Sequence, residues 1–167
     1  MLKKLKINKW IILIVLVVLV VVIGVCKMFG NTVNIRGQHL NEYSCSIGGG
    51  MTGGYRMETV KKYNDQALIR IESAEWHSQD PEVTEYLTDA AVLDELEEIA
   101  RKHKMNTWNK KKFTDMFIAD GESESYRFSF DDEDIYFSSQ IYPKEYREKL
   151  AELDAVVKKY IEAGEKL

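Results

Sequence analysis

The strongest hydrophobic pattern in the chain is the run of residues 11–25, IILIVLVVLVVVIGV, in which every residue except Gly24 is Leu, Ile or Val. Each such residue at a helix centre gains about 0.3–0.6 kcal/mol on entering a bilayer, so the run gains about 4–8 kcal/mol. Residues 10–29 supply the length of about 20 residues that a span needs. We therefore predict a transmembrane helix over residues 10–29, with Trp10 and Phe29 near the two membrane interfaces.

Basic residues are placed unevenly around this run. Several lysines lie within residues 1–9 without an acidic residue among them, whereas Lys27 and Arg36 are the nearest basic residues after the run. The positive-inside rule then places residues 1–9 in the cytoplasm and the chain beyond the anchor outside the cell membrane. We predict a single-pass membrane protein with a cytoplasmic tail, the anchor, a flexible tether over residues 30–41 and an extracytoplasmic domain over residues 42–167.

Two other fates of the hydrophobic run stay open. A cleaved signal peptide has the same basic start and an apolar region of about 7–15 residues, and Gly24 and Cys26 have the spacing of the small residues at a cleavage site. Alternatively, Cys26 is the lipid-bearing cysteine of a bacterial lipoprotein, although Val25 is larger than the residue that precedes such cysteines. All three fates leave the domain on the same side of the membrane.

Beyond the tether, the spacing of apolar residues changes to the alternation that is typical of half-buried strands. Strands are predicted over residues 42–47, 55–63, 67–76, 124–130 and 135–140. Residues 77–88 are predicted to form a loop around Asp80-Pro81, with a short extra strand near Val83 as an alternative. A helix is predicted after Asp89, and a second from Pro143 to Gly164, because apolar residues recur there at i, i+3 and i+4.

The predicted order of elements is β-β-β-α-β-β-α. Strands joined by short turns pair antiparallel, and two amphipathic helices need one apolar sheet face to cover. The sequence therefore predicts an α+β fold, in which an antiparallel sheet of about five strands carries two helices on one face. The other sheet face is expected to be in contact with water.

Charge and cysteine content narrow the function classes. All 27 acidic residues follow residue 29, where 23 − 5 = 18 basic residues lie, so the external part carries a net charge of 18 − 27 = −9. This sign disfavours binding to nucleic acid and disfavours lying flat on anionic lipid. Cys45 is the single cysteine of the external domain, and the other cysteine of the chain, Cys26, lies at the membrane edge. No disulfide framework is therefore predicted.

Motifs of catalysis and of cofactor or metal binding are missing from the sequence. The glycine-rich stretch 48–54 lacks a Gly-Lys-Ser/Thr and precedes a strand, so it is a hairpin loop rather than a phosphate loop. The acidic stretch 131–134 lacks the spacing of an EF-hand and is interpreted as a solvated turn. No histidine pair has the spacing of a zinc site, and no serine nucleophile motif is present. We predict no catalytic, cofactor-binding or metal-binding residue.

Binding is therefore the better hypothesis, and it depends on the sheet face that contacts water. Either Arg56 or Arg70 is expected on that face, together with serines, and Arg and Tyr are enriched at protein interfaces. A glycine-rich hairpin tip and an aromatic residue between two lysine-rich segments add further candidates. The candidate binding residues are Arg70, Arg127, Tyr136, Met51 and Trp108.

A resemblance supports the envelope location. The run from GGGMTGGYRMETVKKYNDQAL through YRFSFDDEDIYFSSQIYPKEYREKLAEL resembles a group of small exported domains of low-GC Gram-positive bacteria. Those domains follow a signal anchor or a lipoprotein signal and end in a Pro-started helix after a two-stranded hairpin. The resemblance covers residues 42–165 and implies no activity, ligand or catalytic residue.

The function expected from these patterns is that of a membrane-anchored, non-enzymatic binding module of the cell envelope. Its expected partners are the lipid bilayer, through residues 10–29, and an envelope protein or polymer, with no nucleic acid. Two alternatives stay open: a ligand-binding or sensing domain of the lipoprotein type, and a hydrolase of envelope polymer that uses carboxylates. A pocket with two carboxyls and one raised pKa would favour the hydrolase, whereas a shallow sheet face would favour binding.

Overall fold

The computed structural model describes residues 16, 18, 31–49, 53–76, 79–111, 113 and 121–167. Apart from Leu16 and Val18, the predicted anchor lies outside these residues. Among the described residues, no helix is both long enough and apolar enough to span a membrane.

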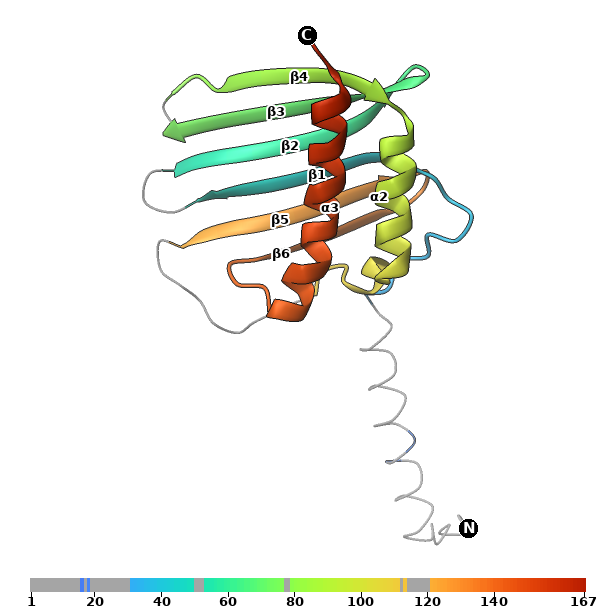
Figure 1. Ribbon diagram of the computed structural model, residues 1–167. Helices are drawn as coiled ribbons and strands as arrows, with labels where there is room; N and C mark the ends of the chain where they lie inside the picture. Colours follow the sequence, from blue (N-terminus) through green and yellow to red (C-terminus); the bar gives the residue numbers. More distant parts are fainter. Residues whose placement is uncertain are drawn as a thin grey trace, which may run out of the picture.

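A single antiparallel sheet forms one layer of the domain (Figure 1). Its order across the described residues is β6-β5-β1-β2-β3-β4-β7. In chain order the strands are β1 (Leu40–Gly49), β2 (Gly53–Tyr63), β3 (Gln66–Trp76), β4 (Glu82–Asp89), β5 (Glu122–Phe130), β6 (Asp134–Ser139) and β7 (Glu165–Lys166). β1 lies in the middle of the sheet because β5 pairs with its free edge rather than with β4.

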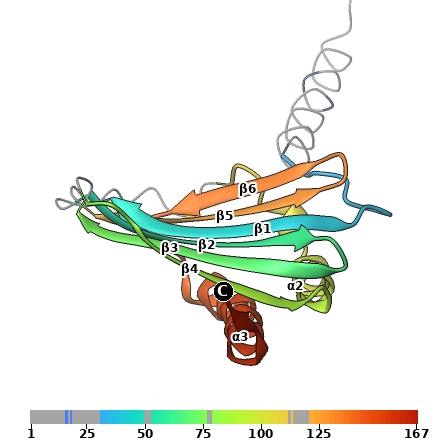
Figure 2. The ribbon, with the colours of Figure 1, turned by 90° about the horizontal axis from the view of Figure 1, so that it is seen from above.

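Two helices form the second layer, and both lie on the same face of the sheet (Figure 2). They are α2 (Ala91–Lys102) and α3 (Lys144–Ala163), and the short 3₁₀ helix η1 (Met105–Thr107) follows α2. α2 buries Leu96 and its apolar neighbours, and α3 buries Leu153 and its own stripe. These side chains meet Tyr43, Phe128 and other inward residues of the sheet in one hydrophobic core. The predicted two-layer α+β fold, with an antiparallel sheet and helices on one face, is confirmed for the described residues.

The sheet is wider than predicted, because seven strands are present in the described part rather than about five. β4 is a full strand of eight residues over Glu82–Asp89, where a loop was expected. β7 pairs with Tyr86 and Leu87 of β4 immediately after α3 ends. Gly164 allows this sharp return, since a Cβ there would lie 2.9 Å from the Tyr160 carbonyl oxygen and 3.1 Å from that of Leu87.

The segment predicted as a flexible tether is packed on the domain over its described part. Val33 and Ile35 are buried in the hydrophobic core. The Val33 amide donates to the Asn106 carbonyl at 3.0 Å, and the Asn106 side-chain amide donates to the Val33 carbonyl at 2.9 Å. Apolar residues at alternate positions thus tie this segment to η1. Between residue 31 and β1 the chain is therefore not a free linker.

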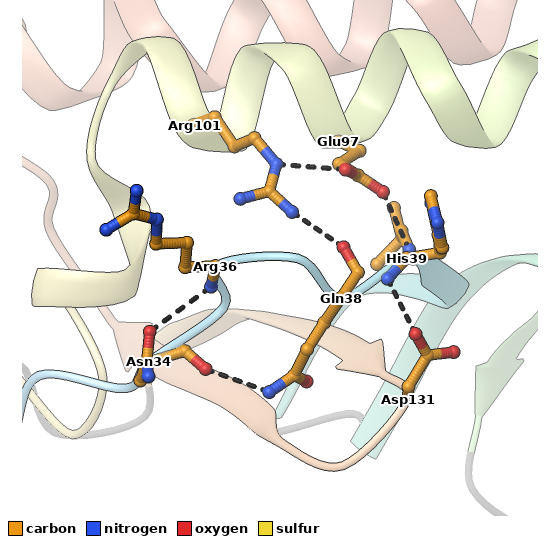
Figure 3. Close-up of polar contacts among 8 residues, drawn as sticks. Asn34, Arg36, Gln38, His39, Glu97, Arg101 and Asp131 are labelled. Carbon is orange, nitrogen blue, oxygen red and sulfur yellow. Dashed lines mark hydrogen bonds and ion pairs between the residues drawn. The ribbon is translucent and has the colours of Figure 1, made fainter.

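Polar contacts hold the rest of the segment against α2 and the β5–β6 turn (Figure 3). The Arg101 guanidinium donates to the Gln38 carbonyl at 2.6 Å, while Glu97 accepts both from Arg101 at 2.9 Å and from the Leu40 amide at 2.8 Å. Asp131 accepts from the His39 amide at 2.8 Å. The His39 amide, together with the side-chain amide of Asn41, lowers the pKa of Asp131. The contacts to His39 and Leu40 fix where β1 begins.

Candidate functional site

The sheet face opposite α2 and α3, which we call the open face, is covered by no described helix (Figure 2). The continuous strand registers align one row of side chains across the open face. The row runs from β6 to β4 through Tyr136, Arg127, Ser44, Thr59, Arg70 and Glu85. Directly opposed residues in antiparallel strands project from the same face, so the row forms one surface.

One end of this row carries a hydrogen-bonded network of charges. Arg70 donates to Glu85 at 3.1 Å and to Glu72 at 3.1 Å, and the Tyr55 hydroxyl donates to Glu72 at 2.6 Å. These donors lower the pKa of the Glu72 carboxyl. Arg70 is therefore held flat along the sheet, with its guanidinium oriented by two carboxylates. A fixed, partly exposed guanidinium loses little conformational entropy when it binds a partner.

The other end of the row has a similar arrangement around Arg127. Its guanidinium forms an ion pair with Asp134, which lowers the pKa of that carboxyl. Tyr136 lies directly opposite Arg127 on β6, and its side chain is 47% exposed. The predicted residues Arg127 and Tyr136 are thus neighbours on the open face.

Exposed apolar side chains are present at several places on the open face. Strand parity places four of the exposed large hydrophobic residues of the domain there: Tyr63, Trp76, Val83 and Tyr136. Scattered apolar residues are normal on a protein surface. An exposed tyrosine directly opposite an ion-paired arginine, as Tyr136 is to Arg127, is typical of an interface.

The structure separates the five candidate residues that the sequence nominates. Arg70, Arg127 and Tyr136 lie in the same row of the open face. Met51 lies outside the described residues. The prediction that Trp108 binds a partner is wrong, because only 4% of this residue is exposed.

Trp108 belongs to the hydrophobic core, as its surroundings show. Its ring packs edge-on against Tyr146, Phe137 and Phe113, with centroid distances of 4.8, 5.3 and 5.8 Å. Lys104 and Lys110, on either side of it in sequence, lie at the surface while the indole is buried. The sequence predicted either Arg56 or Arg70 on the open face. Arg56 projects from the helix-covered face instead, where it is paired with Ile47.

A pocket of about 330 Å³ lies between the sheet and α3, beyond the covered core. Three carboxylates line it, from Glu58 on β2, Glu124 on β5 and Asp154 on α3. Arg56 forms an ion pair with Glu58, and Arg147 donates to Glu124 at 2.9 Å. Asp154 has no ion-pair partner within the described segments. In the same part of the chain, no cluster of three or more His, Cys, Asp or Glu side chains is arranged to hold a metal ion.

The thiol at the base of this pocket is not a nucleophile. Cys45 is buried, and burial raises its pKa to about 12, so the thiol stays protonated at neutral pH. Its neighbour Tyr126 is buried too, and its hydroxyl donates to Glu124. Both groups therefore belong to the packing behind the pocket.

Asp154 is the carboxyl group of the pocket whose pKa is raised. Burial of the carboxyl, together with the charges of Glu124 and Glu58, raises the pKa of Asp154 from 3.8 to about 6. Folding thus favours the protonated acid. The contribution of this group to stability is fully present below about pH 4 and is lost as the pH rises to about 6.

We expect an Asp154→Asn variant to be more stable than the wild type above pH 6, because the amide carries no charge to desolvate. Residue 154 lies at the solvent-accessible mouth of the pocket, so screening limits the gain to about 1 kcal/mol. Urea denaturation across the acid-to-neutral range measures it. Asp80→Asn, at an exposed position in the loop before β4, is the control for the loss of one carboxyl group. A profile of Asp154→Asn parallel to that of the wild type would contradict the assignment.

Sequence reasoning did not find the pocket. Its three carboxylates come from β2, β5 and α3, so they meet only through strand pairing and helix packing. One signal was present: Glu58 and Arg56 occupy inward positions of β2, where apolar residues are expected. These polar residues face inward because they line the pocket.

No protein-family model matches the chain, and no curated protein matches it either. The resemblance to small exported domains stays a prediction.

Proposed function

We propose that this protein is a membrane-anchored, extracytoplasmic binding module of the cell envelope, and that its open face binds a partner protein. The observation that carries the proposal is the composition of that face. Exposed Tyr136 and Trp76 lie on the same surface as Arg70 and Arg127, which neighbouring carboxylates hold in place. Tyr, Trp and Arg are the residues that contribute most to protein interfaces.

The edges of the sheet support a face-on partner rather than an added strand. At the β6 edge, the Lys110 amide donates to the Tyr136 carbonyl and Asn109 accepts from the Tyr136 amide. At the opposite edge, β7 covers part of β4. Loops and short strands that cover edges suppress pairing with other chains. The open face is then the larger unoccupied surface of the sheet.

Photo-crosslinking in native membranes tests the proposal. A photoreactive residue in place of Thr59, at the centre of the open face, should give a defined crosslinked protein. The same residue in place of Ala155, on the exposed side of α3, should not. The double variant Arg127→Ala/Tyr136→Ala should lower the yield from position 59 about thirtyfold, the expected effect of losing an interface hot spot.

Arg56→Ala is the matched control for this experiment. Arg56 and Arg127 are both ion-paired, and their side chains are 50% and 55% exposed, but they project from opposite faces. The crosslinking yield of Arg56→Ala from position 59 should equal that of the wild type. Equal crosslinking from positions 59 and 155, or a yield that ignores Arg127→Ala/Tyr136→Ala, would refute the open face as the binding surface. A crosslink to polysaccharide alone would replace the partner protein with an envelope polymer.

A second function, hydrolysis of an envelope polymer, is favoured by one observation. Asp154 has a pKa of about 6 in a pocket that it shares with Glu58 and Glu124. A carboxyl whose pKa is raised toward neutrality, beside further carboxyl groups, is the arrangement that general acid–base catalysis uses. Release of new reducing ends from cell-wall polymer, abolished by Asp154→Asn, would support this function over binding.

A further inference from the structure

The basic residues of this acidic domain are not evenly neutralised. Within the described ranges, nine of the 17 arginines and lysines form an ion pair with a carboxylate. Those without a carboxylate partner among the described residues are Arg36, Lys61, Lys62, Lys104, Lys110, Lys111, Lys149 and Lys166. Five of them lie where the chain enters the domain or on the elements next to it, and we call these five the junction patch: Arg36, Lys104, Lys110, Lys111 and Lys149.

The entry of the chain brings the junction patch together. Val33 is paired with Asn106 of η1 by two hydrogen bonds, so the entering segment lies against η1. In sequence, η1 lies between Lys104 and Lys110. The end of α2, η1 and the beginning of α3 lie at one end of the domain (Figure 1). Arg36 extends from the entering segment beside the last turn of α2 (Figure 3). Lys149, on the second turn of α3, lies over the Trp108 ring at 5.8 Å.

Chain length limits how far this end of the domain can lie from the membrane. The predicted anchor ends at Phe29, four residues before Val33. Even a fully extended chain spans at most about 3.6 Å per residue, so the Cα atoms of Phe29 and Val33 are at most about 14 Å apart. Lys104 and Lys110 are exposed and extend several ångströms further, whereas Lys111 and Lys149 lie over aromatic rings. The Debye length at physiological salt is about 8 Å. The junction patch is therefore within electrostatic reach of the headgroups.

We propose that the junction patch lies on anionic lipid headgroups of the membrane that holds this chain. This inference rests on the membrane anchor of the proposed function. The occupant follows from charge as well as from distance, because the patch is positive whereas residues 30–167 carry a net charge of −9. An anionic surface attracts the junction patch and repels the rest of the domain, so one orientation is selected.

The orientation has a consequence for the open face. α2 and α3 both run between the junction end and the opposite end of the domain (Figure 1). With the junction patch on the membrane, both helices point away from the bilayer surface. The open face is then roughly perpendicular to that surface. A partner that lies beside the protein in the same membrane then meets the row that contains Arg127 and Tyr136.

Lysine modification measures the proposed contact directly. The full chain is reconstituted into vesicles of zwitterionic lipid, or of zwitterionic lipid mixed with phosphatidylglycerol, and is treated with an amine-reactive reagent before mass spectrometry. Attraction to an anionic surface favours the membrane-bound state of each nearby lysine about fivefold. Lys104 and Lys110 should therefore react at least fivefold more slowly with the reagent in the anionic vesicles. High salt should restore their rates. Lys61 and Lys62, on β2, are internal controls and should react equally in both lipids.

Two variants of equal charge separate local contact from net charge. Arg36→Gln/Lys110→Gln should restore most of the reactivity of Lys104 in anionic vesicles. Lys61→Gln/Lys166→Gln removes the same charge from unpaired basic residues outside the junction patch and should leave Lys104 protected. Equal restoration by both variants, or equal reactivity of Lys104 in both lipids, would overturn the proposal.

Flotation of the same vesicles separates this inference from the proposed anchor. If the chain floats with both kinds of vesicle but Lys104 reacts equally in both, the anchor stands and the junction patch does not contact lipid. If the chain floats with neither kind, the anchor fails and this proposal fails with it. Crosslinking through the open face is unaffected by either result, so that part of the proposed function is tested separately.

Discussion

Replacing Trp108 with alanine should destabilise the domain by about 3–5 kcal/mol, which is the range for removing a large aromatic side chain from a packed core. The indole is 4% exposed and contacts Phe113, Phe137 and Tyr146 edge-on. Its removal leaves a cavity that these rigid rings cannot close by small movements. Because a domain of this size is stabilised by only about 5–15 kcal/mol in total, a large fraction of the stability would be lost. Urea denaturation monitored by far-UV circular dichroism measures the effect.

The matched control is Trp76→Ala, which removes the same side chain from an exposed position. Trp76 is 56% exposed on the open face, so its loss should change the free energy of unfolding by no more than about 0.5 kcal/mol. If Trp108→Ala were as mild as Trp76→Ala, the indole would not be part of the core. If Trp76→Ala lowered partner crosslinking without lowering stability, the open face would gain support as the binding surface.

Trp108 shows why the binding surface could be predicted only in part. Lysines on both sides of an aromatic residue indicate a polar loop, and Lys110 is indeed exposed. The direction of one side chain in an irregular segment depends on where that segment meets the core, however, and residue spacing carries no information about that. Arg127 and Tyr136 were easier to place because the alternation of a strand assigns each residue to a face.

The sheet was predictable where its inward positions are apolar and less so elsewhere. β5 and β6 were identified from the alternate apolar residues Phe128, Phe130, Ile135 and Phe137, all of which are buried. β4 was expected to be a loop because its inward positions are Thr84, Tyr86 and Thr88, which do not give an apolar alternation. β4 forms because β3 offers it a free edge, and that is a property of the assembled sheet.

The tether was misjudged for a related reason. Its polar residues and glycines are typical of a linker, yet Val33 and Ile35 are buried. Two apolar residues are too few to indicate a packed segment, and the decisive contacts come from distant parts of the chain. Glu97 and Asp131, which hold this segment through backbone amides, are 57 and 92 residues from their partners. Such long-range satisfaction of backbone groups is not encoded in local spacing.

Replacing Tyr43 with phenylalanine should have the opposite sign and stabilise the domain by about 1–2 kcal/mol. The Tyr43 hydroxyl is fully buried and has no hydrogen-bond partner among the described residues. Burial raises the pKa of this phenol well above 10.0, so the group is neutral and pays a desolvation penalty without compensation. Phenylalanine removes the hydroxyl and keeps the ring, which packs against Phe128 at a centroid distance of 5.2 Å.

Tyr126→Phe is the matched control, because Tyr126 is also buried in the core but its hydroxyl donates to the Glu124 carboxylate. Hydrogen bonds to charged groups contribute about 1.5–3 kcal/mol, so this variant should be destabilised by about that amount. The two substitutions remove the same atom from neighbouring strands, and their opposite signs isolate the effect of hydrogen bonding. A Tyr43→Phe variant that is less stable than the wild type would show that the hydroxyl has a partner, such as a buried water. Denaturation of both variants in parallel, at a pH below the pKa of either phenol, decides between these outcomes.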